Sequence, residues 1–295
     1  MVISNVSGGL GNQMFQYATG RALAVRRETQ LYLDVSSFQR HSIHQGYELN
    51  RLFGLGNQLA AEENFNEVLG WQRSPLVRRI LSRKSLQPFR KKSFIIEPYF
   101  EYWPGIETTS KNCYLTGYWQ SERYFSDAKK TIRRDFTFPM LPDRENQKLS
   151  QQIIKHNSVS LHVRRGDYIS NSVNSGIYSV CSVEYYARAI ELLIQMVQKP
   201  HFFVFSDDIE WAKKNLSNIG FAGLCTFFSH NRGLTNYVDM QLMSLCQHHI
   251  IANSSFSWWG AWLNDNPRKI VIAPSKWFNK SISTEDLLPT EWLRV

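Results

Sequence analysis

The sequence has few cysteines and no long apolar run, and both shortages restrict the class of protein. Its 295 residues include four cysteines, which are widely spaced: Cys113, Cys181, Cys225 and Cys246. No two of them form a C-x-x-C pair, so neither a zinc site nor a dithiol redox motif is indicated, and we expect reduced, partly buried thiols. No apolar run approaches the roughly 18 residues that a membrane span needs.

The sequence also lacks a secretory leader. The strand-like run Val2–Val6 stands where a leader would carry a basic stretch and then an apolar one. We therefore expect a cytoplasmic protein. Internal repeats and low-complexity tracts are absent too, and a hydrophobic content of 43% is ample for the packed cores of one large domain or two of ordinary size.

Acidic residues are in the minority. The 34 lysines and arginines outnumber the 25 aspartates and glutamates, which gives a formal charge of +9. This balance favours polyanionic partners, namely nucleotides, nucleic acid or acidic lipid, and charge alone does not choose among them. A nucleic-acid binder would show steep salt-dependent binding to oligonucleotides, and we do not expect that function.

Strands and helices alternate regularly in the second half. Strand-like runs occur at residues 159–163, 201–205, 225–228, 249–252 and 270–273, and helix-like stretches at 183–198, 209–216 and 237–246. This alternation predicts an α/β domain with a doubly wound parallel sheet.

The first half opens with a βαβ pattern, in which strand-like runs at residues 2–6 and 30–34 flank a stretch with helical spacing. We expect two Rossmann-like domains, residues 1–152 and 153–295, joined near Gln151 and Gln152. The last residues are expected to pack back on the first domain. The middle of the chain shows no assignable topology.

The first loop partly matches a dinucleotide-binding fingerprint. Two glycines follow the first strand within the run G-G-L-G-N-Q, and Asp34 ends the second strand at the expected distance. However, Met14 stands where the third glycine belongs. NAD binding is therefore only weakly indicated, and Asn12 and Gln13 offer polar side chains to a sugar instead.

Polar residues directly follow three strands of the second half. They are Arg164-Arg165-Gly166-Asp167-Tyr168, Ser206-Asp207-Asp208 and Asn253-Ser254-Ser255. Ligands of open parallel sheets bind beyond the carboxyl ends of the strands. All three segments are therefore predicted to face one crevice.

The two arginines of the first segment predict an anion site. A planar guanidinium forms paired, charge-assisted bonds to phosphate oxygens and stays charged at any working pH. Arg164 and Arg165 therefore suit a diphosphate and can stabilise it as a leaving group without a metal. A structural ion pair with Asp167 is the alternative.

The serine-rich segment precedes a helix-like stretch at residues 256–263. Backbone N–H groups and serine hydroxyls at the start of a helix favour an anion, whereas a simple helix cap accounts for one serine and stays open as an alternative. The tryptophans of this helix favour core packing over a sugar platform; they are Trp258, Trp259 and Trp262.

Asp207 and Asp208 invite a metal interpretation, but metal-dependent sugar transferases use D-x-D, in which alternate carboxylates share one side of a strand. We therefore expect one aspartate to accept hydrogen bonds from a nucleobase or ribose, with a helix cap as the alternative. His162, on the preceding strand, is either a nucleobase contact or a satisfied core histidine.

Five segments together resemble, from end to end of the chain and in the same order, bacterial α-1,2-fucosyltransferases of glycosyltransferase family 11. They are G-G-L-G-N-Q-M-F-Q-Y-A at 8–18, G-Y-W-Q-S at 117–121, H-V-R-R-G-D-Y at 162–168, F-S-D-D at 205–208 and A-N-S-S-F-S-W-W-G-A-W at 252–262. The resemblance implies a GT-B fold, with two Rossmann-like domains facing a central cleft. It also implies inverting transfer of L-fucose from GDP-fucose to the 2-hydroxyl of a terminal galactose, with no required metal or other cofactor.

The same resemblance implies roles for residues at the donor. Arg164 is expected to bind the β-phosphate, with Arg165 in support, and His162 and Asp208 are expected to read guanine. Three serines are expected to hold the diphosphate: Ser254, Ser255 and Ser257. Asn12 and Gln13 are expected across the cleft, near the donor sugar and the acceptor.

Asp167 is the candidate catalytic base, because it is the carboxylate nearest in sequence to the expected phosphate site. Its two arginine neighbours would lower its pKa and make it a poor proton acceptor, so orienting the arginines is an equal alternative. Stabilisation of the leaving diphosphate is then expected to carry most of the rate.

Residues 73–92 are basic and contain no acid. The basic residues are Arg73, Arg78, Arg79, Arg83, Lys84, Arg90, Lys91 and Lys92, and they are interleaved with Leu76, Val77, Ile80, Leu81 and Leu86. A solvated basic face is one interpretation. The functional hypothesis is docking on an anionic membrane leaflet.

A protein that binds a nucleotide or a glycan without turnover is the alternative to an enzyme. It would use the same basic crevice but would need no stabilisation of a leaving group.

Overall fold

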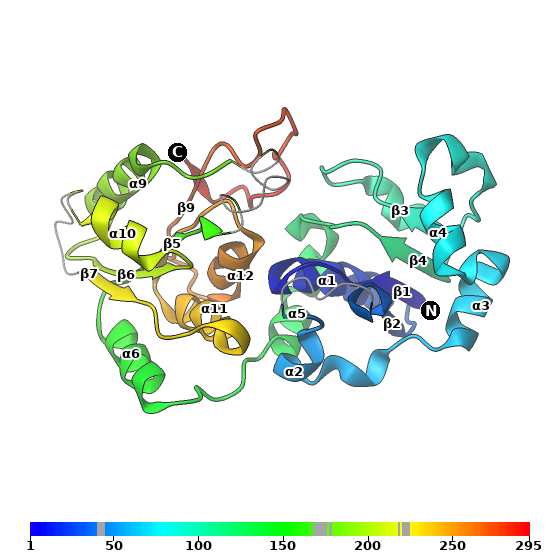
Figure 1. The fold of residues 1–295 in the computed structure, drawn as a ribbon, viewed down its shortest axis with the longest axis horizontal. Helices are drawn as coiled ribbons and strands as arrows, with labels where there is room; N and C mark the ends of the chain where they lie inside the picture. The colour runs from blue at the N-terminus through cyan, green and yellow to red at the C-terminus, as the bar shows by residue number, and fades with distance from the viewer. Residues whose placement is uncertain (40–44, 167, 169–175, 177–178, 218, 220–224) are drawn as a thin grey trace. The chain divides into compact units, whose positions relative to one another are not determined.

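The protein forms two compact units in a computed structural model that describes residues 1–39, 45–166, 168, 176, 179–217, 219 and 225–295. Unit 1 contains residues 1–139 and 283–287, and unit 2 contains residues 140–282 and 288–295 (Figure 1). The sequence placed the division near Gln151. In the structure that position lies within helix α6 (Arg144–Lys155), which belongs to unit 2 and packs beside α11 (Tyr237–Leu245).

Unit 1 is built on a parallel sheet with strand order β2-β1-β4-β3. Its strands are β1 (Val2–Asn5), β2 (Leu31–Asp34), β3 (Phe94–Ile96) and β4 (Cys113–Thr116). Its α-helices are α1 (Leu10–Arg26), α2 (Leu49–Phe53), α3 (Glu62–Leu69), α4 (Pro75–Leu81) and α5 (Lys129–Asp135). Short 3₁₀ helices occupy much of the middle of the chain, which explains why its sequence shows no clear hydrophobic period.

Helix α1 is buried on most of its circumference, and the buried residues include the polar side chains of Gln13, Gln16 and Thr19. Gly20 lets it approach the sheet, because a Cβ at this position would lie 2.8 Å from Leu31 Cδ1 and 3.0 Å from Ser4 Cβ. Gln16 ties the helix to two loops. Its Oε1 accepts from Ser7 N at 2.8 Å and its Nε2 donates to Gly117 O at 2.9 Å.

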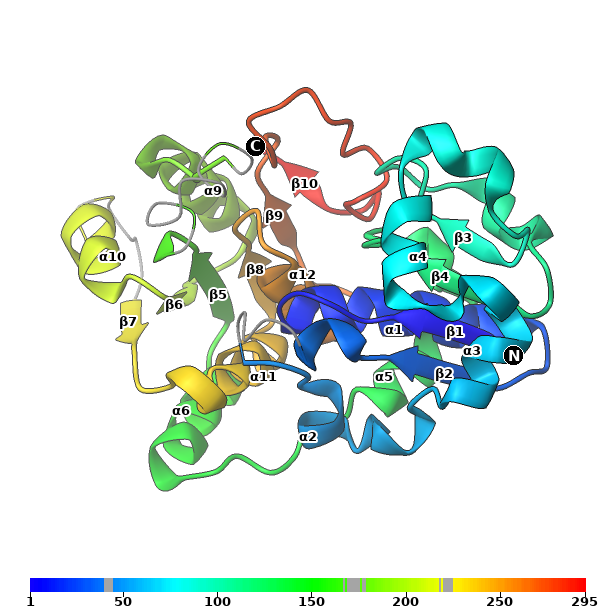
Figure 2. The same cartoon turned by 45° about the vertical axis from the view of Figure 1, so that its right-hand side comes forward.

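Unit 2 is built on a six-stranded parallel sheet with the order β10-β9-β8-β5-β6-β7 (Figure 2). Its strands are β5 (Ser158–Val163), β6 (His201–Ser206), β7 (Cys225–Phe228), β8 (His248–Ile250), β9 (Val271–Ala273) and β10 (Leu293–Arg294). Its remaining helices are α9 (Val183–Met196), α10 (Ile209–Leu216) and α12 (Ser255–Leu263). The alternation predicted a parallel α/β sheet, and the structure confirms it.

The strand order reverses between β5 and β8. The chain runs from β5 outward through β6 to β7, and it then returns to β8 and proceeds the other way to β10. Right-handed crossovers in opposite directions place helices on opposite faces, and accordingly α10 packs beside α9 while α11 packs beside α6 and α12. Ligand sites of such sheets form beyond the strand ends at the reversal.

Buried apolar side chains hold unit 2 together. All six residues of β5 are buried, as in a strand covered on both faces. The three tryptophans of α12 are at most 2% exposed, and Trp258 and Trp259 pack edge to face with ring centroids 5.0 Å apart. Their prediction as core residues is confirmed, and the four cysteines are free thiols as predicted.

Candidate functional site

A cavity of about 350 Å³ lies in unit 2, at the carboxyl ends of β5, β6 and β7 and beside the starts of α11 and α12. Its lining is mainly polar and comprises His162, Arg164, Ser206, Asp207, Ile209, Ser229, Asn231, Arg232, Gly233, Asn236, Asp239 and Phe256. The volume falls within the usual range for small-molecule sites. Two of the three segments predicted from strand ends therefore meet here, and the helix that follows the third contributes Phe256.

The carboxylate of Asp207 fixes the turn that carries the arginines. Its Oδ1 accepts from Arg165 N at 2.9 Å, and its Oδ2 accepts from Gly166 N at 3.0 Å. A Cβ on Gly166 would lie 2.8 Å from that Oδ2, so a larger residue here would require the Asp207 carboxylate to shift. Asp207 also pairs with Arg164 through Nη1 at 3.1 Å, which directs that guanidinium along the cavity wall.

Arg165 has a different environment and does not line the cavity. Its guanidinium lies 3.9 Å from the ring centroid of Trp211, and its Nε is 3.4 Å from Asp208 Oδ2. Asp208 in turn caps α10, because its Oδ1 accepts from Trp211 N at 3.2 Å. The helix-cap alternative for Asp208 is therefore the one that the structure shows, and a contact between Asp208 and guanine stays a prediction without support from this geometry.

His162 is a neutral wall of the cavity. Burial, aided by the charge of Arg164, lowers the pKa of His162 to about 3. Its ring lies 5.8 Å from that of Phe256, and its Nδ1 is buried with no hydrogen-bond partner among the described residues. A neutral imidazole with an unpaired ring nitrogen beside an aromatic ring can serve a nucleobase.

Asp239 is a cavity carboxylate that the sequence analysis missed. It lies in the first turn of α11, and its Oδ1 accepts from Asn231 Nδ2 at 2.7 Å. Burial raises the pKa of Asp239 to about 7, although the hydrogen bond from Asn231 opposes the shift. Asn236 Oδ1, also in the lining, is buried without a partner among the described residues. The rule that polar residues follow strand ends would have found this segment after β7, had it been applied there.

The serines of α12 mostly satisfy backbone groups. Ser254 caps the helix by accepting from Phe256 N at 3.3 Å, and Ser257, which is 1% exposed, donates to Ala252 O or Ser254 O. Ser255 is partly exposed. None of these three serines lines the cavity, so their contact with a diphosphate stays a prediction.

In unit 1 the predicted residues follow β1. Gln13 is fully buried and bonds three backbone groups, through Nε2 to Gly8 O and Gly46 O and through Oε1 to Glu48 N. This gives Gln13 a structural role. Asn12 accepts from Gln120 Nε2 at 2.7 Å. Donor or acceptor contacts of both residues stay predictions, and Asp167, the candidate base, lies outside the described residues.

The carboxylate of the partial dinucleotide-binding fingerprint, Asp34, is already occupied by other residues of the chain. Asp34 is 2% exposed, its Oδ2 pairs with Arg78 Nη1 at 2.6 Å, and the same oxygen accepts from Tyr114 Oη at 2.8 Å. Burial alone would raise the pKa of Asp34, but Arg78 and the hydrogen bonds outweigh burial and lower it. Asp34 is therefore occupied by a buried ion pair and is not presented to a ribose.

Comparison with known proteins relates the whole chain to glycosyltransferases. A model of glycosyl transferase family 11 matches residues 1–295. An alpha-1,2-colitosyltransferase of Escherichia coli is 37% identical over 100% of this chain and 99% of its own length, and the O-antigen biosynthesis glycosyltransferase WbnK of the same species is 33% identical over 96% and 98%. Human galactoside alpha-(1,2)-fucosyltransferase 1 is 26% identical over 61% of this chain and 52% of its own length.

The crystal structure of the fucosyltransferase NodZ from Bradyrhizobium matches 92% of this chain and 94% of its own, with a TM-score of 0.56 and 16% identity. This likeness bears on the fold alone. Together with the two parallel sheets it confirms the predicted α/β fold of GT-B type.

The neutral state of His162 predicts a pH-dependent stability. Between about pH 3, its pKa in the folded chain, and about pH 6.5, its ordinary value, the unfolded chain binds a proton that the folded chain does not. Stability is thus fully present above about pH 6.5 and declines as the pH falls toward 3. Between pH 7 and pH 5, wild type should lose about 2 kcal/mol more unfolding free energy than His162→Gln in urea titrations. Parallel pH curves for the two proteins would contradict the buried, neutral histidine.

Proposed function

Since the chain belongs to glycosyl transferase family 11, we propose that it transfers L-fucose from GDP-fucose to the 2-hydroxyl of a terminal galactose on a glycan, with inversion at the anomeric carbon. The observation that carries the proposal is the cavity in unit 2, which combines a positioned guanidinium, a neutral imidazole and a buried carboxylate. The names of the relatives support glycosyl transfer, since they include an alpha-1,2-colitosyltransferase and a galactoside alpha-(1,2)-fucosyltransferase.

Arg164 is the group that we assign to the leaving diphosphate. Transfer breaks the bond between the anomeric carbon and the β-phosphate oxygen, and it forms a bond from that carbon to the acceptor oxygen, which loses its proton. Negative charge therefore develops on the diphosphate, where a preorganised guanidinium stabilises the transition state more than the ground state. Asp207 holds Arg164 in place and needs no metal to do so.

Replacement of Arg164 by alanine should lower turnover by about two orders of magnitude or more. Asp207 keeps its two backbone donors in this variant, so we expect the fold to survive, with an unchanged far-ultraviolet circular dichroism spectrum. Arg268→Ala, an exposed arginine of the same unit, is the matched control and should retain normal turnover. The assay measures GDP release from GDP-fucose with and without a terminal galactoside, in excess chelator.

Near-normal turnover of Arg164→Ala would contradict the phosphate role, and loss of wild-type activity that a divalent metal restores would contradict metal independence. GDP binding without release in the presence of any galactoside would favour the alternative, a non-catalytic binding protein. GDP-colitose is the informative competing donor, because colitose lacks the 3-hydroxyl of fucose and a site built to bond that hydroxyl discriminates strongly between the two.

Asp239 is the carboxylate that we assign to guanine, in place of Asp208. Guanine presents two parallel donors, N1–H and the 2-amino group, which match the two acceptor oxygens of a carboxylate. Asp239 lines the cavity together with His162 and Phe256, and Asn231 orients it. Asp208, by contrast, caps α10 through Oδ1 and pairs with Arg165 through Oδ2.

Asp239→Asn should abolish the preference for GDP over inosine diphosphate, which lacks the 2-amino group, and should weaken GDP binding roughly tenfold or more at pH 8. Wild-type affinity should also fall below about pH 7, where Asp239 takes up a proton. Calorimetric titration measures both effects. Asp208→Asn is the control and should keep the preference; the reverse pattern would return the guanine contact to Asp208.

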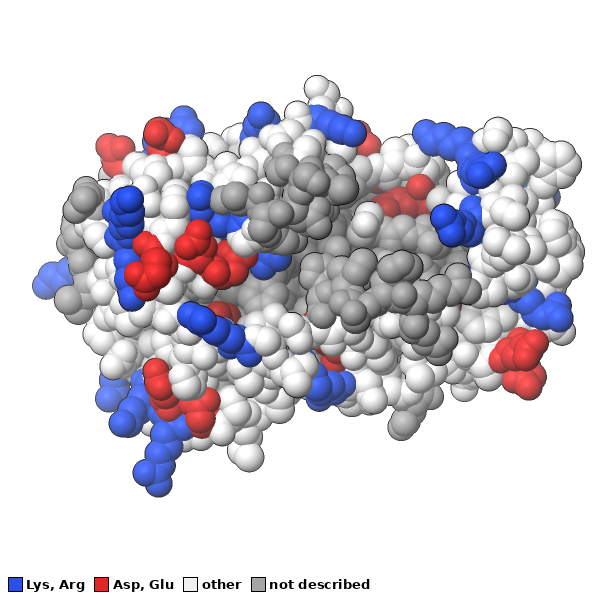
Figure 3. All heavy atoms as spheres, viewed as in Figure 1, with Lys and Arg blue, Asp and Glu red and all other residues white. Residues whose placement is uncertain are grey.

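We also propose that residues 71–92 dock on an anionic membrane surface. Four apolar side chains of this segment are exposed: Trp71 at 62%, Leu76 at 64%, Ile80 at 44% and Phe89 at 66%. Basic residues surround them, and no acid occurs between Glu67 and Glu97. Figure 3 shows basic atoms over α4 and the segment that follows it. Apolar side chains with a basic surround complement the interface of an anionic bilayer.

Within the described ranges, none of the helices combines the length and the apolar character that crossing a bilayer requires. The proposed contact is therefore peripheral, and co-sedimentation with vesicles measures it. Wild type should bind phosphatidylglycerol vesicles better than phosphatidylcholine vesicles, and Leu76→Ser with Ile80→Ser should reduce binding severalfold. Met140→Ser removes an apolar residue that is 93% exposed elsewhere and should change nothing. Indifference to the anionic lipid would remove the proposal.

A further inference from the structure

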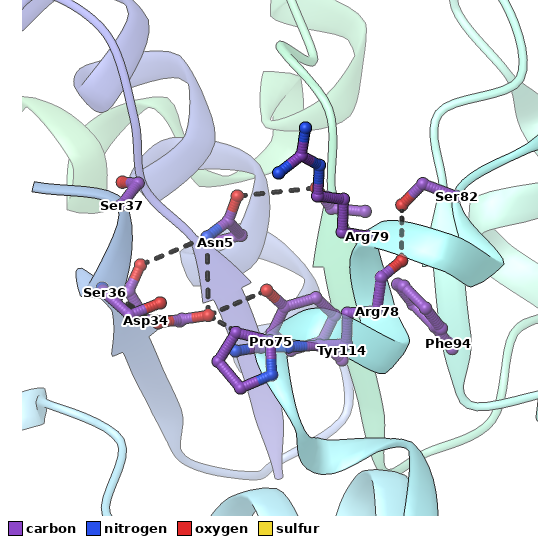
Figure 4. A pocket seen from close by; sticks show the side chains of 11 residues that line it. Asn5, Asp34, Ser36, Ser37, Pro75, Arg78, Arg79, Ser82, Phe94 and Tyr114 are labelled. Atoms are coloured by element: carbon purple, nitrogen blue, oxygen red, sulfur yellow. Dashed lines mark hydrogen bonds and ion pairs between the residues drawn. The ribbon is translucent and has the colours of Figure 1, made fainter. Parts of the chain in front are cut away.

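A second cavity, of about 170 Å³, lies in unit 1 and has no role in the donor site described above. It is located at the carboxyl ends of β1, β2 and β4, where ligands of open parallel sheets bind (Figure 4). Its lining comprises Asn5, Asp34, Ser36, Ser37, Pro75, Arg78, Arg79, Ser82, Phe94, Tyr114 and Thr116.

One face of α4 forms a wall of this cavity. Pro75, Arg78, Arg79 and Ser82 line it with the spacing of a single helical face, whereas Val77 and Leu81 pack into the core cluster that also contains Phe94 and Tyr114. The remaining positions, Leu76 and Ile80, are exposed. Within residues 73–92, Arg78 and Arg79 thus line a cavity, whereas other basic residues lie at the surface. The sequence pattern alone did not distinguish these two groups.

The floor of the cavity is held by an ion pair and by hydrogen bonds between its own side chains. Asp34 and Arg78, both nearly buried, form the ion pair at 2.6 Å, and Tyr114 donates to the same carboxylate. Asn5 Nδ2 lies 3.4 Å from both Asp34 O and Asp34 Oδ2, and Thr116 Oγ1 lies 3.4 Å from Asn5 Oδ1. These contacts fix the floor before a ligand binds.

The hydroxyl groups of the walls are donors to the protein as well. Ser37 Oγ donates to Val6 O at 2.7 Å, and Ser82 Oγ donates to Arg78 O at 2.8 Å. Their oxygen lone pairs remain available, so these side chains accept hydrogen bonds from a ligand. A polyhydroxylated ligand supplies such donors, whereas a bare phosphate ion, which mainly accepts, does not.

Arg79 provides a charged donor group beside these hydrogen-bond acceptors. Figure 4 shows its guanidinium directed away from the Asp34–Arg78 pair. It is exposed, and no described residue forms an ion pair or hydrogen bond with it. Since Asp34 and Arg78 neutralise each other, the lining carries a net charge of +1 at Arg79. A guanidinium in this position binds a carboxylate or phosphate with paired bonds.

From this combination we infer that the cavity of unit 1 binds an acidic sugar residue of the acceptor glycan, one that bears a carboxylate or a phosphate. The sugar hydroxyls donate to Ser37 and Ser82, and the acidic group lies on Arg79. The cavity accommodates one sugar ring rather than a nucleotide. This inference rests on the proposed glycosyl transfer, because it assigns the cavity to the acceptor.

Direct binding tests the site independently of turnover. The full chain, saturated with GDP to fill the cavity of unit 2, is titrated calorimetrically with galacturonate, galactose and inorganic phosphate at low ionic strength. We expect galacturonate to bind wild type more tightly than either of the other two, and Arg79→Gln to weaken galacturonate roughly tenfold or more. Arg83→Gln removes the same charge just beyond the end of α4, outside the lining, and should leave the affinity unchanged.

Four outcomes overturn the inference: no binding of galacturonate to wild type, equal binding to wild type and Arg79→Gln, an equal loss in Arg83→Gln, or tighter binding of inorganic phosphate than of galacturonate. The last would indicate a free-anion site. GDP release from GDP-fucose by wild type is measured alongside, with a terminal galactoside present as the acceptor. Failure of wild type to release GDP counts against the proposed transfer, whereas altered galacturonate binding counts for or against the acidic-sugar site alone.

Discussion

The candidate site depends on the carboxylate of Asp207. This one group bonds the backbone of Arg165 and Gly166 and pairs with the guanidinium of Arg164, so it joins the end of β6 to the turn after β5. Without a fixed turn, Arg164 would have to be ordered by the ligand, at a cost in side-chain entropy. Because folding already orders this side chain, the guanidinium is in position before the diphosphate that we propose as its ligand arrives, which is the arrangement that electrostatic catalysis requires.

Each unit contains an ion pair between an aspartate and an arginine, but the two pairs have different roles. In unit 1 the side chains of Asp34 and Arg78 are 2% and 9% exposed, and the pair serves as the floor of a cavity. In unit 2 Asp207 and Arg164 are 26% and 28% exposed, so the guanidinium is accessible to a ligand. A buried pair is costly to break because it leaves an uncompensated charge, whereas an accessible pair can exchange part of its bonding for a phosphate. Burial therefore decides which arginine stabilises the fold and which is accessible to a ligand.

Burial also sets the charge of the donor cavity, and it acts in opposite directions on its histidine and its carboxylic acid. It lowers the pKa of His162 to about 3 and raises that of Asp239 to about 7. Between these values both groups are predominantly uncharged, and the positive charge of the lining comes from its arginines. Near neutral pH a negative charge appears at Asp239. The carboxylate that we propose for guanine is therefore charged only at and above about pH 7.

The sequence by itself determined the parallel sheets, the buried helix α12 and the position of Arg164, because hydrophobic periodicity and the residues that follow a strand are local properties of the chain. Only the tertiary structure decided which residues the charged side chains of the two cavities contact. In the folded chain Arg164 pairs with Asp207, Asp208 caps a helix and Asp239 lines the cavity. Arg78 and Arg79 of one helix lie in different environments. The cap at Asp208 is a local contact, but the two ion pairs depend on burial and on contacts between residues about 40 to 80 positions apart, and no local pattern encodes the low polarity that shifts a pKa or the geometry that selects one carboxylate over its neighbour.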